Sequence, residues 1–150
     1  MPDAVFVKTW KAIQTAIAVN YAAGYSGLNL TNRVIRGAIP EAPMLPYASI
    51  FLLDNVETAG PVLTRYSGKM IFEIYAFAAG SDVTSRTDNA LNLGADIINA
   101  LTADRSLGLA GAIDDLICSI AALDGDRLGV PSSGVAFLNV SVTFQSDRGV

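Results

Sequence analysis

The stretch from Val62 to Ala79 constrains the fold most, because it alternates with the period of a β-strand and yet has no polar face. Side chains point alternately to the two faces of a strand. From residue 69 onward, one face carries Met70, Phe72, Ile74 and Ala76, and the other carries Lys69, Ile71, Glu73, Tyr75 and Phe77. A strand that is apolar on both faces is usually covered on both. We therefore expect one long strand, or a bent pair, that is covered by helices or by another subunit.

Further strands are expected on both sides of this one. Residues 47–56, 113–123 and 135–144 are rich in large apolar residues, and the last segment alternates between apolar and polar positions. Residues 32–39 are a candidate edge strand. A turn is predicted over residues 57–61, which contain Ala59-Gly60-Pro61, and a long polar hairpin loop over residues 124–134.

An amphipathic helix is predicted from about residue 4 to residue 22. Asp3 is its expected N-cap, and Gly24 its expected stop, because glycine tolerates the left-handed conformation that ends helices. Trp10 is interpreted as a core residue, although an anchor for a partner is an alternative. The apolar stripe recurs at helical spacing and consists of Phe6, Trp10, Ile13, Ile17 and Tyr21.

A second helix is predicted from about Thr87 to Ala103, with Ser85 as its cap and Asp88 three positions later. Its expected buried face is Ala90, Leu91, Gly94, Ile97, Ile98 and Leu101. The order of elements predicts an α+β fold with a mainly antiparallel sheet of four to five strands, flanked by an N-terminal helix and a central helix. We expect residues 1–150 to form a single domain.

An irregular, proline-rich arm is expected near residues 37–46. Pro40, Pro43 and Pro46 lack backbone donors and fix their own dihedral angles, so this segment is neither a central strand nor a helix. An extended segment of this kind is stiff and is easily ordered against a neighbouring molecule. An ordinary surface crossover is the commoner alternative.

Charge and composition exclude several classes of protein. Charged residues make up only 16% of the 150 residues, hydrophobic residues 51%, and the net charge is −4. The basic residues are scattered singly, which argues against a dedicated nucleic-acid binder. The start of the chain lacks the basic region of a signal peptide, and the long uncharged stretch from residue 12 to residue 32 is too polar for a membrane span. We therefore expect a soluble intracellular product with no membrane contact.

The side chains that most often act in catalysis or bind metal ions are missing from this chain or stand alone in it. The chain has no histidine, and its one cysteine, Cys118, lies in an apolar run where it is expected to be a small buried hydrophobe. Asp124 and Asp126 resemble the start of a calcium loop, but the later ligands are missing, so turn chemistry explains them better. We expect no catalytic residue, no metal and no cofactor.

Residues 62–146, together with the first helix, resemble the tail terminator, or minor tail completion, proteins of long-tailed bacteriophages. The resemblance rests on a succession of elements. The first two are a hydrophobic strand that ends at Ala78-Ala79-Gly80 and a helix that is followed by Asp104-Arg105-Ser106-Leu107-Gly108. The other two are a strand that begins at Asp114-Asp115 and the terminal strand Val140-Ser141-Val142-Thr143-Phe144.

The resemblance implies a structural virion protein rather than an enzyme. Such subunits close into a ring, typically of six copies, on the last ring of the tail tube at the head-proximal end. The ring stops tube polymerisation and gives the neck or head-completion protein a surface to dock on, while DNA passes through its centre without specific binding. The implied partners are therefore other copies of the chain, the tail tube protein and the neck, first in the host cytoplasm and then in the virion.

Candidate contact residues lie in the irregular segments, since loops carry partner contacts more often than cores do. In the arm they are Pro40, Pro43, Met44 and Pro46, and in the hairpin loop they are Asp126 and Arg127. Arg65, Arg86 and Arg105 are candidates for ion pairs between subunits, with a solvated surface charge as the alternative for each.

Three other functions are compatible with the sequence. A head–tail joining protein of the neck belongs to the same virion. A small oligomeric α+β enzyme and a protein that binds a peptide along a sheet edge belong to other classes. Oligomer size discriminates among them, because a closed ring favours the virion proteins and a monomer favours the peptide binder.

Overall fold

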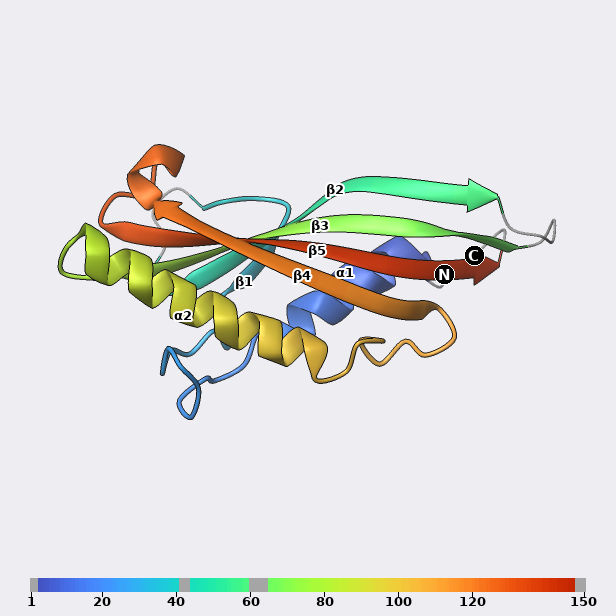
Figure 1. Cartoon of the computed structure of the whole chain (residues 1–150), viewed down its shortest axis with the longest axis horizontal. Helices are drawn as coiled ribbons and strands as arrows, with labels where there is room; N and C mark the ends of the chain where they lie inside the picture. The colour runs from blue at the N-terminus through green and yellow to red at the C-terminus, as the bar shows by residue number, and fades with distance from the viewer. Residues whose placement is uncertain (1–2, 41–43, 60–64, 148–150) are drawn as a thin grey trace.

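The computed structural model describes residues 3–40, 44–59 and 65–147. These residues form two long helices, a short 3-10 helix and five strands (Figure 1). In chain order these are α1 (Val5–Ile17), β1 (Val34–Arg36), β2 (Tyr47–Ala59), β3 (Arg65–Ala79), α2 (Val83–Thr102), β4 (Ile113–Asp124), η1 (Gly125–Leu128) and β5 (Ser133–Asp147).

The five strands form one sheet in the order β1-β2-β3-β5-β4. Only the short β1 runs parallel to its neighbour, β2, and all other pairs are antiparallel. β3 lies in the middle, where Phe72 is opposite Leu52 of β2 on one side and Val140 of β5 on the other. The predicted α+β class and the mainly antiparallel sheet are therefore confirmed.

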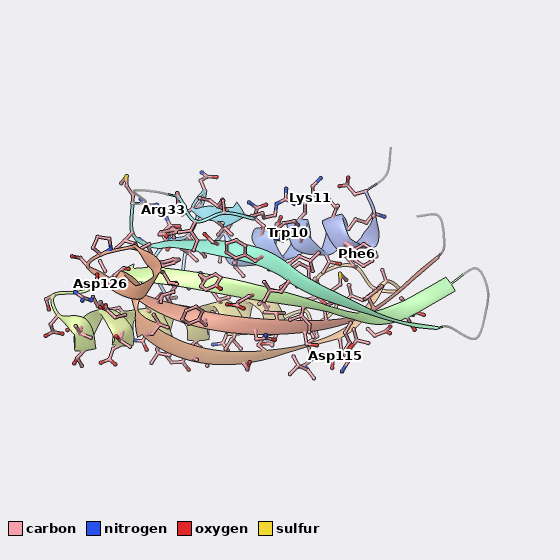
Figure 2. All side chains as sticks on the ribbon, turned by 90° about the horizontal axis from the view of Figure 1, so that it is seen from above. Phe6, Trp10, Lys11, Arg33, Asp115 and Asp126 are labelled. Carbon is pink, nitrogen blue, oxygen red and sulfur yellow. The ribbon has the colours of Figure 1, made fainter. Side chains whose placement is uncertain are left out.

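Both long helices pack on the same side of the sheet (Figure 1). The main core lies between them and the strands. The face of β3 that carries Met70, Phe72, Ile74 and Ala76 is fully buried there, as is the apolar face of β5. Figure 2 shows Phe6 and Trp10 of α1 toward the sheet and Lys11 on the outer side. The Trp10 indole Nε1 donates a hydrogen bond to the Ile50 carbonyl of β2 at 3.2 Å, which favours the core interpretation of Trp10.

α1 is shorter than predicted. It ends at Ile17 rather than near residue 22, and Asp3 is not its cap, because Ala4 occupies the N-cap position and the Asp3 carboxylate instead accepts a hydrogen bond from Lys11 at 2.6 Å. Tyr21 is buried, as the stripe predicted, but it lies beyond the helix. Its hydroxyl donates to the carbonyl of Ile17 at 2.9 Å, one of the groups that a helix end leaves without an internal partner.

α2 begins four residues earlier than predicted, and its cap is Asp82 rather than Ser85. The Asp82 carboxylate accepts a hydrogen bond from the backbone nitrogen of Ser85 at 2.7 Å. The buried face is rotated slightly from the predicted one, because Leu91 is exposed and Ile98 only half-buried. The residues of α2 that are buried are Ala90, Leu93, Gly94, Asp96, Ile97 and Leu101.

Other boundaries also differ from the prediction. β5 runs from Ser133 to Asp147 rather than over residues 135–144, and the predicted hairpin loop contains the 3-10 helix η1. Residues 57–59 continue β2 instead of starting the turn, whose Gly60 and Pro61 lie outside the described residues. The candidate edge strand over residues 32–39 is reduced to three residues, and it ends where Gly37 takes a positive φ of 82°.

Candidate assembly surface

The sheet face that points away from the helices carries a row of aromatic side chains. The rings of Tyr47 and Phe77 stack with centroids 4.5 Å apart and an interplanar angle of 6°. Tyr75 meets Phe51 and Phe137 edge to face, at 5.3 and 4.8 Å. Such cross-strand contacts are a unit of sheet stabilisation. Here they join β2, β3 and β5 on the face opposite to the main core.

Part of this aromatic face is covered by the chain itself. Ile39 and Leu45, both within the arm, pack with Leu128 and Val130 against Tyr47 and its neighbours, forming a second, smaller core. Farther along the sheet, none of the described helices covers this face, and Leu53 and Ile117 are 54% and 65% exposed. Among the described residues, the second face of β3 is thus covered by its own chain only at one end.

Two hydroxyl groups are buried on this face without a hydrogen-bond partner among the described residues, Tyr47 Oη and Ser49 Oγ. A buried polar group without a partner costs about 1 to 3 kcal/mol. Burial also raises the pKa of Tyr47 to about 12. The hydroxyl groups of Tyr47 and Ser49 therefore lie in apolar surroundings, where a hydrogen bond to an added acceptor would stabilise the protein.

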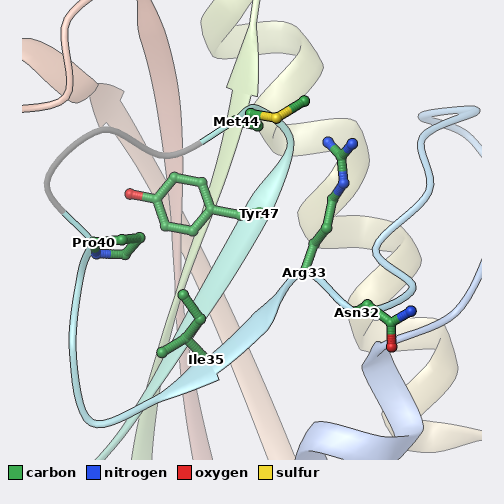
Figure 3. Close-up of a pocket in the computed structure, with 6 residues that line it drawn as sticks. All are labelled: Asn32, Arg33, Ile35, Pro40, Met44 and Tyr47. Carbon is green, nitrogen blue, oxygen red and sulfur yellow. The ribbon is translucent and has the colours of Figure 1, made fainter.

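A pocket of about 370 Å³ opens beside Tyr47 at the arm (Figure 3). Arg33 lies at its border and donates from Nη1 to the carbonyl oxygens of Leu45 and Pro46, at 3.2 and 3.5 Å, so that it ties the arm to the start of β1. The lining residues are Asn32, Arg33, Ile35, Pro40, Met44 and Tyr47.

The predicted arm residues are only partly brought together. Pro40 and Met44 both line the pocket, and Met44 is 75% exposed. Pro46 immediately precedes β2 and accepts one of the Arg33 hydrogen bonds. Pro43 lies outside the described residues. That these residues contact another molecule stays a prediction.

The sheet has two edges that are unlike each other. β4 forms one edge along its whole length and pairs only with β5 among the described strands. On the other side, β1 covers β2 only over Ala48 to Ile50, so in the described part of the chain the rest of β2 pairs with β3 alone. Edge strands offer unpaired backbone groups to an incoming strand. Arg105 occupies part of the β4 edge, because its Nη2 donates to the carbonyl of Leu116 at 2.8 Å.

Two of the predicted arginines have partners within the chain. Arg86 of α2 binds Asp124 through Nε–Oδ1 and Nη2–Oδ2 contacts of 2.8 and 3.2 Å, and its Nη2 lies 3.8 Å from Asp126. This guanidinium holds the pKa of Asp124 below its usual range. The side chains of Arg65 and Arg127 are not among those described.

Arg105 forms the second pair, with Asp115 at the start of β4, at an Nε–Oδ1 distance of 2.6 Å. Figure 2 places Asp115 and Asp126 toward opposite ends of β4. Arg86 and Arg105 therefore form ion pairs within the chain at the two ends of the same edge strand, β4. A contact with a second subunit would be additional to these pairs, and it stays a prediction.

Sequence reasoning missed one buried polar site. Asp96 of α2 is 4% exposed and binds the loop between α1 and β1 through Tyr25 and Ser26. In the sequence, this segment is predicted only to contain the stop of the first helix, at Gly24, and nothing in it indicates that Tyr25 and Ser26 bind a carboxylate. The sequence feature that could have predicted this site is Asp96 itself, because it places a carboxylate between Gly94 and Ile97 on the apolar face of the helix.

Among the described residues, no group of three or more histidine, cysteine, aspartate or glutamate side chains could hold a metal ion. Cys118 is half-buried on β4, and burial raises the pKa of its thiol, which lowers its reactivity. No helix in the described part of the chain is long and apolar enough to cross a membrane.

Comparison with known proteins identifies the fold but not a family. The chain is similar to a chain in the virion of a native gene transfer agent particle, with a TM-score of 0.66 and 17% sequence identity. The similarity covers 97% of this chain and 100% of that chain, so the two share one architecture from end to end. No protein-family model matches the sequence, and no curated protein matches it either.

Proposed function

We propose that this protein is a structural subunit of a phage-type virion that assembles into a ring and caps the tail tube. The observation that carries the proposal is the end-to-end similarity of its fold to a component of a gene transfer agent virion. The proposed position at the head-proximal end of the tail rests on the resemblance of residues 62–146 to tail terminator proteins. The proposed partners are other copies of the chain, the tail tube protein and the neck.

Two features of the surface support self-assembly. The sheet ends in two unlike edges, β4 and the distal part of β2, which suits a head-to-tail contact between copies rather than a symmetric one. A head-to-tail contact generates a closed ring when the rotation between neighbours closes. The exposed apolar side chains of Leu53 and Ile117 would gain cover in such a contact.

The charge of the chain supports passage of DNA through the ring. A protein that holds DNA needs clustered lysine and arginine side chains to displace the counterions of the phosphates. This chain has a net charge of −4, and its basic residues are scattered. A ring of such subunits would let a DNA molecule slide through its lumen.

The proposal is tested by the absolute mass of the purified protein in solution, measured by light scattering, with negative-stain images of the same sample. A closed ring of several subunits with a central hole is the expected result. A particle that stays monomeric or dimeric over the whole accessible concentration range would contradict the proposal.

A second experiment tests the place of the ring. The tail tube protein of the same particle is allowed to polymerise with and without this protein, and tube lengths are measured in images. We expect shorter tubes that carry a ring at one end only. Tubes of unchanged length, or decoration along their sides, would contradict a terminator and leave a neck component as the alternative.

A further inference from the structure

The outer edge of β4 is closed at its start by two side chains of the same chain. The backbone nitrogen of Leu116 donates to Asp115 Oδ1 at 2.8 Å, and the Leu116 carbonyl accepts a hydrogen bond from Arg105 Nη2, also at 2.8 Å. Both backbone groups of Leu116 therefore point away from β5, toward the edge of the sheet. A strand that added itself to this edge would have to displace both side chains at Leu116.

The backbone groups farther along the same edge have no such side-chain partners. In a regular antiparallel pair, every second residue points its N–H and C=O groups away from the neighbouring strand. The register with β5 is regular over the rest of β4, so the residues that point to the edge as Leu116 does are Cys118, Ile120 and Ala122. Among the described strands, none lies on that side of β4. Each of the three residues therefore offers one donor and one acceptor to an added strand.

This part of the edge also lacks the features that normally keep sheet edges apart. Natural edge strands are protected by charged side chains, by proline, by bulges or by being short. Residues 117–123 contain no charged residue, no proline and no glycine, and six of the seven are apolar. An exposed edge of that composition is prone to aggregation. Because ion pairs lie at both ends of β4 and residues 117–123 carry no charge, this stretch is expected to be covered in the functional particle.

Large apolar side chains border the open stretch on both faces of the sheet. Ile117 is 65% exposed on the face that points away from the helices. Ile120, which lies opposite the buried Leu138 in the register, is 39% exposed on the helix side. A strand with apolar residues on both of its faces would cover both isoleucines. The edge of β4 therefore fits an extended, mainly apolar segment of protein.

The same chain has a segment of this kind at the other edge of its sheet. β1 covers β2 only up to Ile50, and residues 51–59 have no neighbour on that side among the described strands. Phe51 and Leu52 lie on opposite faces of the sheet, and Leu53 is 54% exposed. The free part of β2 is thus an extended segment that begins with apolar side chains on both faces.

The directions of the strands make the two edges compatible. β2, β3, β5 and β4 follow one another in the sheet, each antiparallel to the next, so β2 and β4 run in opposite directions within one subunit. Neighbouring copies in a ring are related by a rotation about one axis, and strands that run along this axis keep their direction. β4 of one copy would therefore meet β2 of the next copy antiparallel. Two β4 strands joined about a two-fold axis would instead leave both β2 edges free and stop at a dimer.

We propose that the edge of β4 over residues 117–123 pairs antiparallel with the free edge of β2, residues 51–59, of the neighbouring subunit. The sheets of successive subunits then form one continuous sheet, with the helices of every copy on the same side. Asp115 and Arg105, by occupying the backbone of Leu116, mark where this pairing begins on β4. This inference rests on the proposed self-assembly and names the two strands that join the copies.

Hydrogen exchange tests the pairing residue by residue in the wild-type protein. In a dilute, unassembled sample, the amide hydrogens of Cys118, Ile120 and Ala122 should exchange faster than those of the odd-numbered residues between them, which bond to β5. In the assembled ring, the three fast amides should slow by about tenfold or more. A ring in which these three amides stay fast would overturn the inference and leave the proposed function standing. A wild type that never assembles would overturn both.

Ala122→Pro removes one of the donors that point to the edge. Proline is tolerated on an edge strand where its missing N–H would face outward, so the unassembled variant should keep the circular dichroism spectrum of the wild type. Its ring would stand against the incoming strand, so self-association measured by light scattering should weaken by about tenfold or more. Ala122→Ser keeps the N–H group and is the matched control. A folded Ala122→Pro that assembles as well as Ala122→Ser would overturn the inference, and if the proline variant does not fold, the exchange pattern of the wild type decides.

A photo-cross-link identifies the strand that meets β4. With p-benzoylphenylalanine in place of Ile117, the protein is assembled with an isotopically labelled wild type, irradiated and digested, and linked peptides are identified by mass spectrometry. Links to residues 51–59 of the labelled copy are expected. Links to residues 113–124 of the labelled copy would show two β4 strands paired about a two-fold axis, and would overturn the inference.

Discussion

Ser26 donates two hydrogen bonds to one oxygen of Asp96, from its backbone nitrogen at 2.8 Å and from its hydroxyl at 2.6 Å. The two residues are 70 positions apart in the sequence. With the bond from the backbone nitrogen of Tyr25 to the other oxygen, the carboxylate accepts hydrogen bonds from three donors of the loop between α1 and β1. A single side chain on the buried face of α2 therefore fixes the conformation of a loop that precedes the first strand.

Asp96→Asn is expected to lower the free energy of unfolding by about 2 to 3 kcal/mol, because hydrogen bonds to a charged group are replaced by weaker ones and an amide donor now faces backbone donors. Chemical denaturation followed by circular dichroism measures the change. Asp88→Asn, at an exposed position of the same helix, is the control and should change stability little. Equal effects of the two substitutions would show that the loop does not depend on the carboxylate.

Gly94 is expected to resist replacement, although glycine is a poor helix former. A Cβ atom there would lie 2.5 Å from Ile120 Cδ1 and 3.2 Å from the Cβ of Ala136, both on the sheet beneath α2. Alanine gains about 1 kcal/mol of helix propensity, but overpacking costs about 1 to 3 kcal/mol. We expect Gly94→Ala to destabilise the protein on balance, by about 1 kcal/mol.

A double-mutant cycle checks the cause of that loss. Ile120→Val removes the Cδ1 atom that the new methyl group would strike, so Gly94→Ala should cost less in the Ile120→Val background than in the wild type. The free energy of unfolding of all four proteins is compared. Strict additivity of the two substitutions would exclude the proposed collision.

The Arg86–Asp124 pair predicts part of the acid sensitivity of the fold. The guanidinium keeps the pKa of Asp124 lower in the folded chain than in the unfolded one. Such a group stabilises the fold fully above the unfolded carboxyl pKa of about 3.9, and this contribution is lost as the pH falls through the lower, folded pKa. Melting temperatures are compared between about pH 2 and pH 6. Asp124→Asn should flatten the acid end of the curve, whereas Asp88→Asn should leave the wild-type slope.

Periodicity was sufficient to predict the elements that depend on local pattern. The alternation in residues 69–77 separated the two faces of β3, and the alternation in residues 135–144 gave the buried face of β5. The helical stripe gave the face of α1 only in part: Ile13 and Ile17 are buried, but the other buried residues of the helix are Val5 and Thr9, whereas Phe6 and Trp10 are half-buried. These predictions succeeded because burial on one side of a regular element repeats with the period of that element. The α+β class followed from the order of the elements.

The features that were not predicted depend on contacts between distant segments, which the local periodicity of the sequence does not reveal. Tyr21 continues the helical stripe and is buried, yet the helix ends before it, since the backbone at Val19 pairs with Leu30 instead. The hydrogen bonds of Asp96 likewise join segments that are distant in sequence. The pocket beside Tyr47 is formed by residues from β1, the arm and β2, so no single stretch of sequence indicates it.

Ile117 gives a direct test of whether the β4 side of the open sheet face is used in assembly. It is 65% exposed on the edge strand, and in the register of the sheet it lies opposite Ser141. Ile117→Glu removes little buried apolar area from the isolated subunit, so its melting temperature should stay within a few degrees of the wild type. A carboxylate buried in a contact between copies would be strongly unfavourable, so assembly measured by light scattering should weaken by about tenfold or more.

Val83→Glu is the matched control, because Val83 is also an exposed apolar residue, 54% exposed, but lies in the first turn of α2, where a negative charge is favourable. We expect it to assemble like the wild type. If Ile117→Glu assembles equally well, the β4 side of the open face stays in solvent, and the contact between copies lies elsewhere on the subunit. If both variants fail to assemble, the effect comes from added negative charge on an already acidic chain and not from the position of Ile117.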